Sequence, residues 1–202
     1  MRRDLDIWRC AIVRPRGAQI TQDDLTADNL VWLPQTRAFS FRADPFGLWD
    51  GDRLHVFVER FDYRSPRGVI EVLTFDRDLG LIDSRTALER SWHLSFPCVF
   101  RAEGEVWMLP EARRSGELTL YRARNLPDQW EEAAVIAIDP AAVDATPLFH
   151  DGRWWLFYGR GGRNAPGSME LNLAFADRLT GPWTAHPCNP VRHGLGSPLA
   201  AL

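Results

Sequence analysis

One segment of the sequence occurs three times, and this repeat constrains the fold more than any other feature. Each copy reads x-Pro, a short apolar run, a polar turn ending in glycine, and a second apolar or aromatic run; the copies span residues 44–59, 96–111 and 146–159. The prolines Pro45, Pro97 and Pro147 lie 52 and 50 residues apart. A repeat of about 50 residues is typical of a β-propeller.

Each copy has the pattern of a β-hairpin, because its glycine falls where a turn needs positive φ and its flanks carry strand-forming residues. A third segment with residues alternating between two faces follows each hairpin, at 68–75, 117–123 and 169–175. Trp130 and Trp183 follow turns at which an outer, fourth strand would begin. The sequence therefore predicts an all-β chain, a β-propeller of four-stranded antiparallel blades. A β-sandwich with periodic hairpins is the alternative.

The repeat also predicts how the chain is divided. We expect N-terminal strands and a connector at 1–38, three blades at 39–193 (about 39–90, 91–140 and 141–193), and a tail at 194–202 that is a possible truncation point. Propellers close with four to eight blades, so about three blades of five would form an incomplete propeller. Such a stack has open blade faces, through which the chain could self-associate; a fragment of a longer protein is the other interpretation.

Composition excludes several classes of protein. The net charge of −3 does not favour binding to nucleic acid. No apolar run approaches the roughly 18 residues that span a bilayer, and the first residues lack the apolar core of a signal peptide, so we expect a cytoplasmic chain without membrane insertion. Cys10, Cys98 and Cys188 are far apart and predict neither a disulfide nor a zinc site; no metal and no cofactor is expected.

Tryptophan is abundant, with nine residues in the chain. Most of these side chains would pack between blades, because large flat side chains fill the space between twisted sheets. An aromatic face exposed in a cleft is also a common platform for a sugar ring. The partner that we expect is therefore a carbohydrate or glycan.

Propeller geometry indicates where a site would lie, because the innermost strands converge on the central channel. Asp44 lies just before the repeated proline in the first copy, Phe96 in the second, and Thr146 in the third, with Asp144 two residues earlier. Glu59 and Glu111 occupy matching positions after the second apolar run. The candidate catalytic residues are thus Asp44, Glu111 and Asp144.

Four further residues are candidates for substrate binding: Arg42, Glu59, His93 and Arg113. A histidine at the mouth of the channel would suit sugar hydroxyls, and an arginine could hold a phosphate or carboxylate on a glycan. Each also has a structural interpretation. His93 could be a buried structural histidine, and Arg113 could be a solvated loop residue.

Several motifs together indicate a family: 42–46 (Arg-Ala-Asp-Pro-Phe), 93–97 (His-Leu-Ser-Phe-Pro), 109–111, 120–123 and 181–190. With these motifs the chain resembles the five-bladed propellers of family 43 type glycoside hydrolases. It is more similar to the N-terminal propeller of the plant glucosamine inositolphosphorylceramide transferases and their bacterial relatives, over about residues 30 to 193. In the hydrolases an Asp base, an Asp that modulates the acid and a Glu acid meet at the axis. Asp44 matches the base, Phe96 stands at the second position, and Asp144 rather than a Glu is near the third.

Cleavage of a glycoside needs one carboxylic acid to protonate the leaving oxygen and one carboxylate to activate water or attack carbon. We take Asp44 as the base and Glu111 as the acid, with Asp144 as an alternative partner. The sequence thus predicts a glycoside hydrolase-like propeller that acts on or recognises a glycan through carboxylates at the channel mouth. The alternative is a non-catalytic carbohydrate-binding or scaffolding propeller associated with glycan or glycolipid biosynthesis.

Overall fold

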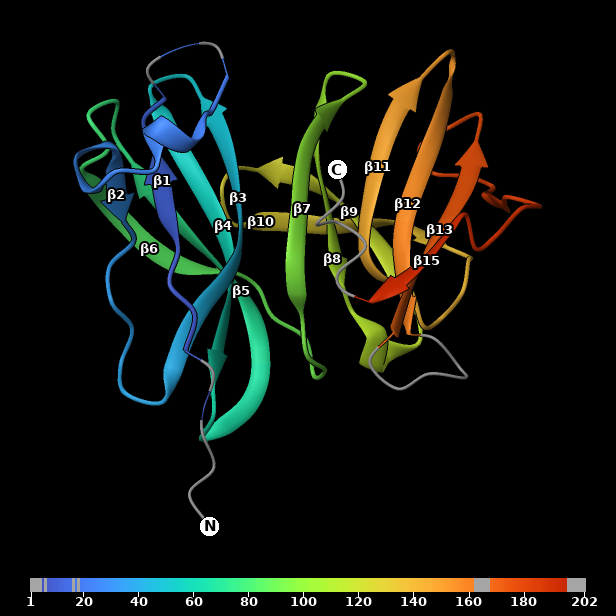
Figure 1. Cartoon of the computed structure of the whole chain (residues 1–202), viewed down its shortest axis with the longest axis horizontal. Helices are drawn as coiled ribbons and strands as arrows, with labels where there is room; N and C mark the ends of the chain where they lie inside the picture. The colour runs from blue at the N-terminus through green and yellow to red at the C-terminus, as the bar shows by residue number, and fades with distance from the viewer. Residues whose placement is uncertain (1–4, 6, 16, 18, 162–167, 196–202) are drawn as a thin grey trace.

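The computed structural model shows an all-β chain in which three antiparallel sheets follow one another around a common centre (Figure 1). The structure describes the chain except for residues 1–4, 6, 16, 18, 162–167 and 196–202. Most of the predicted tail therefore lies outside the described residues. Within the described ranges the helices are single turns of three residues, and none could cross a bilayer.

Each large sheet is one propeller blade in which consecutive strands pair in order. Blade 1 consists of β3 (Ser40–Asp50), β4 (Arg53–Asp62), β5 (Ser65–Phe75) and β6 (Leu81–Leu88). Blade 2 consists of β7 (Ser95–Ala102), β8 (Glu105–Glu111), β9 (Leu118–Asn125) and β10 (Gln129–Ile136). Blade 3 consists of β11 (Val143–His150), β12 (Arg153–Gly161), β13 (Ser168–Ala176) and β14 (Thr184–Ala185), and β15 (Arg192–Leu195) also pairs with β13. The predicted fold class, an all-β propeller of four-stranded antiparallel blades, is confirmed.

The glycines of the repeat make the turns between the first two strands of each blade. Gly51 has a φ of 56° in a two-residue loop, which is the pattern of a type II′ turn. In blades 2 and 3 both loop residues have positive φ, as in a type I′ turn: Glu103 with Gly104, and Asp151 with Gly152. These turns match the twist of the flanking strands, which explains why this part of the sequence pattern was informative.

A short N-terminal hairpin covers the outer face of blade 1. It pairs β1 (Ala11–Val13) with β2 (Leu30–Trp32), and two 3-10 turns, η1 (Gln22–Asp24) and η2 (Ala27–Asn29), lie between these strands. Cys10 and Leu33, which flank the hairpin, pack with Leu54, Val56, Val58, Leu73 and Phe75 of blade 1. Blade 1 is thus enclosed on both faces, because blade 2 packs on the other side.

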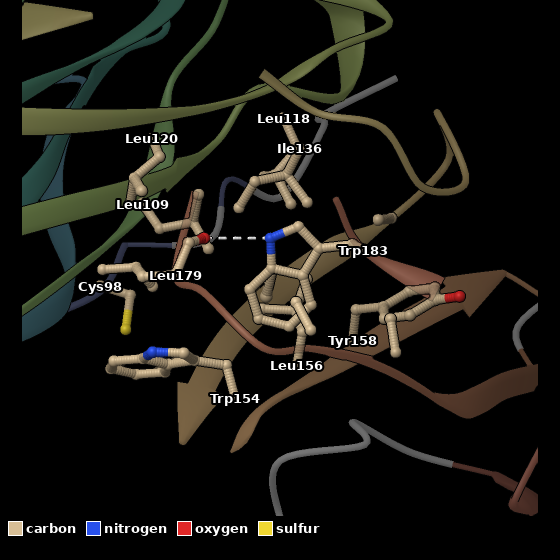
Figure 2. Close-up of a cluster of buried hydrophobic side chains, with 14 of the residues drawn as sticks. Cys98, Leu109, Leu118, Leu120, Ile136, Trp154, Leu156, Tyr158, Leu179 and Trp183 are labelled. Atoms are coloured by element: carbon tan, nitrogen blue, oxygen red, sulfur yellow. Dashed lines mark hydrogen bonds between the residues drawn. The ribbon is translucent and has the colours of Figure 1, made fainter. Parts of the chain in front are cut away.

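Two further apolar clusters lie between the blades. Phe57, Ile70 and Val72 of blade 1 meet Val99 and Met108 of blade 2. Between blades 2 and 3, Leu109 and Leu120 meet Trp154 and Leu156, as Figure 2 shows, and Trp107 belongs to the same cluster. In the same cluster the indole Nε1 of Trp183 donates to the carbonyl oxygen of Leu179 over 3.1 Å. Tryptophans therefore fill space between blades, as their positions in the repeat predict.

The far face of blade 3 is less enclosed than the face toward blade 2. Residues at alternate positions of β12 differ in burial, since Trp154 and Leu156 are buried whereas Trp155 and Phe157 are only partly buried. The ring of Phe175 lies 6.0 Å from that of Trp155 on this partly covered side. Blade 3 thus presents apolar side chains on a face that no other described sheet covers.

Candidate functional site

The innermost strand of every blade has the same backbone irregularity near its start. In β3 the pairing skips one residue between Ala43 and Phe46, and equivalent shifts occur in β7 and β11. At each shift one residue has left-handed φ: 50° at Asp44, 43° at Phe96 and 52° at Asp144. The equivalent of Asp44 in blade 3 is therefore Asp144 and not Thr146, so the alignment on the repeated proline was displaced by two residues in that blade.

In a regular strand successive side chains point to opposite faces of the sheet, and the β-bulge breaks this alternation at its own residue. Aspartate accepts left-handed φ more readily than most residues, whereas a bulky residue does so only under constraint. At Phe96 the ring is packed against the ring of Phe46, 4.9 Å away in an edge-to-face arrangement, and this packing accompanies the left-handed φ. The bulge position thus carries a carboxylate in blades 1 and 3 and an aromatic ring in blade 2.

A second set of equivalent positions lies opposite the bulges. Glu59 pairs with Ala43, and Glu111 pairs with Ser95, one residue before the bulge in each blade. Gly159 has this place in blade 3. The matching positions predicted for Glu59 and Glu111 are therefore real, and two carboxylates join Asp44 and Asp144 near the same end of the inner strands.

The side chain of Glu59 is buried, that of Asp44 is half-buried, and the charge of Asp44 acts on Glu59. Burial raises the pKa of Asp44, while a hydrogen bond from the backbone N–H of Phe96 to Oδ2, 3.2 Å long, opposes this shift. Burial, followed by the charges of Asp44 and Glu111, raises the pKa of Glu59 from 4.5 to about 8. Of these two groups, Asp44 has a donor that stabilises its ionised form.

Glu111 and Asp144 form a hydrogen-bonded pair of carboxyl groups across blades 2 and 3. Burial raises the pKa of Glu111, and the charge of Asp144 adds to this effect, whereas the backbone N–H of Asp144 opposes it. Burial also raises the pKa of Asp144, with a further contribution from the charge of Asp44. Two carboxyl groups can bond directly only when one of them carries a proton. Their hydrogen bond raises the pKa of Glu111 and lowers that of Asp144, which places this proton on Glu111.

Asp44 and Glu59 line one cleft of about 560 Å³ together with Trp8, Cys10 and Phe41. The indole of Trp8 is 63% exposed, so one aromatic face is available beside two carboxyl groups. Trp8 was not predicted as a site residue, because it lies outside the repeat and no motif in its neighbourhood marks it.

His93 lies beside Glu59, as expected for a residue near the channel mouth. Its Nε2 is 3.4 Å from Oε1 of Glu59, and its Nδ1 accepts a hydrogen bond of 2.9 Å from the backbone N–H of Gly68. A Cβ atom at Gly68 would lie 2.4 Å from the carbonyl oxygen of Leu94 and 2.8 Å from Oε1 of Glu59. Gly68 was missed, although a glycine inside a strand pattern often marks such a close approach.

The two arginines predicted to bind substrate lie elsewhere. Arg42 forms a bidentate ion pair with Glu71, with Nε 2.6 Å from Oε2. Its Nη1 donates to the carbonyl oxygen of Pro34, and it lines a separate cavity of about 290 Å³. Arg113 is exposed in the turn η3 (Arg113–Ser115). The neighbouring Arg114 is the arginine whose charge acts on the candidate site, since burial and then this charge lower the pKa of His93.

Among the described residues, no group of three or more His, Cys, Asp or Glu side chains could hold a metal ion. Cys10 is beside the cleft, where its thiol donates to the carbonyl oxygen of Arg42. Burial and the charge of Asp44 raise the pKa of this thiol to about 11, so it is not a nucleophile near neutral pH.

Comparison with known sequences places most of the chain in one group. A family profile described as glucosamine inositolphosphorylceramide transferase 1, N-terminal, matches residues 31–198. The glucosamine inositolphosphorylceramide transferase 1 of Arabidopsis thaliana is 36% identical over 166 residues, which are 77% of this chain and 20% of that protein. The protein of the same name from Oryza sativa subsp. indica is 36% identical over 154 residues, 75% of this chain and 21% of that protein. The chain thus spans about a fifth of the length of these relatives.

Comparison with solved structures shows the same fold in glycoside hydrolases. A family 117 glycoside hydrolase of the marine bacterium Zobellia galactanivorans superposes with a TM-score of 0.63 at 17% identity, covering 77% of this chain and 58% of that chain. A thermostable family 43 glycoside hydrolase superposes with a TM-score of 0.57 at 14% identity, covering 74% and 55%. At such identities the likeness establishes the propeller fold alone.

Proposed function

The chain belongs to the family of glucosamine inositolphosphorylceramide transferase 1 N-terminal domains, and from this premise we propose that it is a carbohydrate-active propeller that cleaves a glycosidic bond. The glycan would bind in the cleft of Asp44 and Glu59. One observation carries the proposal: a half-buried and a buried carboxyl group with different environments line one cleft beside an exposed indole.

These differences supply the two protonation states that hydrolysis needs. Asp44 receives the N–H of Phe96 and is suited to act as the base. Glu59 and Glu111 both have raised pKa values, so each can hold a proton near neutral pH. In the reaction the oxygen of water bonds to the anomeric carbon while Asp44 takes its proton. The acid gives its proton to the leaving oxygen as the glycosidic bond breaks.

Trp8 supports a sugar as the ligand in this cleft. An aromatic ring offers a flat apolar face to the C–H side of a sugar ring, and the carboxyl groups offer acceptors to its hydroxyls. The glycoside hydrolases of the same fold and the family relatives both have names that refer to sugars. These similarities support a carbohydrate-related role, and the assignment of individual carboxyl groups is our proposal.

A non-catalytic glycan-binding propeller is the second candidate, favoured by one observation. The bulge of blade 2 carries Phe96, so the three equivalent positions provide two carboxylates instead of three. In that case the carboxyl groups would serve only as hydrogen-bond acceptors for sugar hydroxyls. Affinity would then survive changes that abolish proton transfer.

The first experiment is thermal unfolding of the purified chain with mono- and oligosaccharides of arabinose, xylose, galactose, glucosamine and uronic acids. A bound sugar at a hundred times its dissociation constant stabilises the native state by about 2.7 kcal/mol. We expect one sugar class to raise the melting temperature. If none of the panel raises it or is hydrolysed, the proposal of a carbohydrate site fails.

Asp44→Asn then separates the two candidates. Asparagine keeps an acceptor for Phe96 and tolerates left-handed φ, so the fold and the sugar affinity are retained. Loss of the base lowers turnover by about 10²–10⁴-fold in an enzyme. Asp52→Asn is the matched control, because Asp52 is an exposed carboxylate paired with Arg77. Turnover that is unaffected by Asp44→Asn would disprove the role of Asp44 as the base.

Two predictions about the surroundings of the chain accompany this proposal. The sequence predicts a cytoplasmic location, which cell fractionation would test. It also predicts self-association through open blade faces, for which the partly buried Trp155, Phe157 and Phe175 are the available apolar side chains. Sedimentation of the wild-type chain and a Phe157→Glu variant would test this contact.

A further inference from the structure

Glu59 and His93 lie side by side, and the position of a proton on one or the other decides what the cleft can do. With this proton on the carboxyl group, both side chains are neutral. With it on the imidazole, the two side chains form an ion pair. The separation of 3.4 Å between Nε2 and Oε1 fits either arrangement, so other contacts of the two side chains must decide between them.

The contact at the far side of the imidazole excludes the ion pair, because it keeps the ring neutral. The backbone N–H of Gly68 points at Nδ1 from 2.9 Å, which requires a lone pair on that nitrogen. In a neutral ring the single N–H is then on Nε2, the atom that faces Glu59. An imidazolium would carry a proton on Nδ1 directed at the N–H of Gly68, and that hydrogen bond would be lost.

The backbone around Gly68 cannot easily move to relieve such a clash. The carbonyl oxygen of Gly68 accepts the N–H of Leu94, so both polar backbone groups of this residue are engaged with the segment that carries His93. The position where a Cβ would be is already 2.9 Å from Cε1 of the His93 ring. The ring is therefore held in one orientation and one tautomer.

The charges around the pair act in the same direction. Asp44 on β3 opposes a negative charge on Glu59, and Glu111 on β8 adds to this effect whenever it is ionised. Arg114, beyond the end of β8, opposes a positive charge on His93. Burial disfavours both ions of an ion pair, since the side chain of Glu59 is only 9% exposed.

Glu111 holds its proton in a different way. Its carboxyl group is bonded to Asp144, so its proton is engaged between two carboxyl groups of neighbouring blades. Glu59 instead lines the cleft that Asp44 and Trp8 also line. Of the two protonated candidates, Glu59 is thus the one that shares its cleft with the proposed base.

We propose that His93 is a positioning residue: because it accepts the N–H of Gly68 at Nδ1 it stays neutral, and the proton remains on Glu59, which acts as the acid of the cleft. This inference rests on the proposed function for its chemical consequence. In the reaction the proton of Glu59 passes to the leaving oxygen, and Glu59 becomes a carboxylate that accepts Nε2–H of His93.

Nitrogen-15 NMR of the full chain with labelled histidine tests the tautomer without any ligand. The His93 signals are assigned by their loss in His93→Gln. We expect an unprotonated Nδ1 and a protonated Nε2 at pH 7. Carbon-13 labelling of glutamate, with Glu59→Gln for assignment, should show that Glu59 titrates with a pKa of about 8. A doubly protonated His93 ring beside an ionised Glu59 at pH 7 would overturn the proposal.

A pair of matched variants gives a second test. Glu59 and Glu71 are each 7% exposed, but Glu71 is bonded to the permanently charged Arg42. Glutamine resembles a protonated glutamic acid, so Glu59→Gln should shift the melting temperature at pH 5 by less than about 4 °C. Glu71→Gln removes the charge from an ion pair and should lower it by roughly 6–20 °C. Equal losses in the two variants would show that Glu59 is ionised in the folded chain.

Activity adds a readout that a merely structural role would not change. With a sugar that is turned over, Glu59→Gln should abolish cleavage, while His93→Asn, which keeps an acceptor for Gly68, should shift the pH profile of kcat/KM. Asp52→Asn, at an exposed carboxylate paired with Arg77, should retain cleavage. If no sugar of the panel binds, the proposed function fails, and the NMR experiment still decides the position of the proton.

Discussion

The backbone N–H of Phe96 donates to Oδ2 of Asp44 over 3.2 Å, and this bond joins blade 2 to the carboxylate of blade 1. The same relationship recurs one blade further, where the backbone N–H of Asp144 supports the carboxylate of Glu111. In both cases the donor is the residue of a β-bulge. Each of these two bulges therefore donates a backbone hydrogen bond to a carboxyl group of the preceding blade. The ionisation of that carboxyl group depends on how the two blades pack.

Asp44→Ala should destabilise the chain more than Asp44→Asn. Alanine has no acceptor for the N–H of Phe96 and pays roughly 1–2 kcal/mol for the left-handed φ of 50°. Asparagine avoids both costs. Urea unfolding measures the difference, which we expect to exceed 1 kcal/mol. Equal stabilities would show that neither the bond nor the bulge conformation matters for folding.

The stability of the chain should fall as pH rises through the titration of Glu59. Its pKa is about 8 in the folded chain and 4.5 ordinarily, so the folded chain keeps a proton that the unfolded chain releases between these values. This contribution is complete below about pH 4.5 and is lost as pH approaches 8, with a slope of at most about 1.4 kcal/mol per pH unit.

Glu59→Gln cannot titrate at this position. The unfolding free energy of the variant should therefore rise relative to that of the wild type as pH increases. The comparison of the two chains is needed because His93 acts in the opposite sense. Its pKa is lowered from 6.5, so its effect on stability increases as pH rises toward that value. A difference that is constant between pH 5 and 8 would contradict the raised pKa of Glu59.

Arg42→Ala should cost about 3–5 kcal/mol, because it leaves the carboxylate of Glu71 buried without its partner. The side chains of this pair are only 12% and 10% exposed, and Ser84 donates to the same carboxylate. Arg64→Ala is the control: its pair with Asp62 is exposed, and its loss should cost less than about 1 kcal/mol. Denaturant titration measures both. If Arg42→Ala lowers the unfolding free energy only slightly, the ion pair is not a main source of stability, and the substrate-binding role predicted for Arg42 from the sequence stays open.

Gly68→Ala should destabilise the chain by about 1–3 kcal/mol, since the new methyl group would meet the carbonyl oxygen of Leu94. It should also alter the NMR signals of His93. Gly47→Ala in the same blade is the control, because its Cβ would lie 3.6 Å from Cδ1 of Leu54, an ordinary contact. If both variants melt at the same temperature, the backbone approach at Gly68 is less tight than described.

Trp8→Ala should weaken the affinity for a sugar of the panel by roughly tenfold, the factor that corresponds to about 1.4 kcal/mol, and leave folding unchanged. Its indole is exposed and contacts the cleft of Asp44. Trp49→Ala is the control, since Trp49 is 49% exposed but lines a different cavity. Titration calorimetry distinguishes them, and an equal effect of both changes would remove Trp8 from the site.

The hairpins were predictable because their signals are local. Gly51, Gly104 and Gly152 occupy turns whose φ requires glycine, and the flanking residues alternate within a few positions. Equivalence of Glu59 and Glu111 followed from the same spacing. In blade 3 the spacing predicted the wrong residue as the equivalent of Asp44. The bulge residue lies one position before the proline in blade 1 (Asp44 and Pro45) but three positions before it in blade 3 (Asp144 and Pro147). A bulge position depends on strand pairing, which a proline alone does not fix.

The sequence by itself determined that the chain forms hairpins at a period of about 50 residues, and hence blades, because strand alternation and turn chemistry act between neighbours along the chain. Only the tertiary structure decided which polar groups meet: Arg42 with Glu71, Gly68 with His93, and His93 with Glu59. These partners lie far apart in sequence or on different strands. The protonation of a carboxyl group depends on the burial and charges that such packing creates, and no local pattern encodes them.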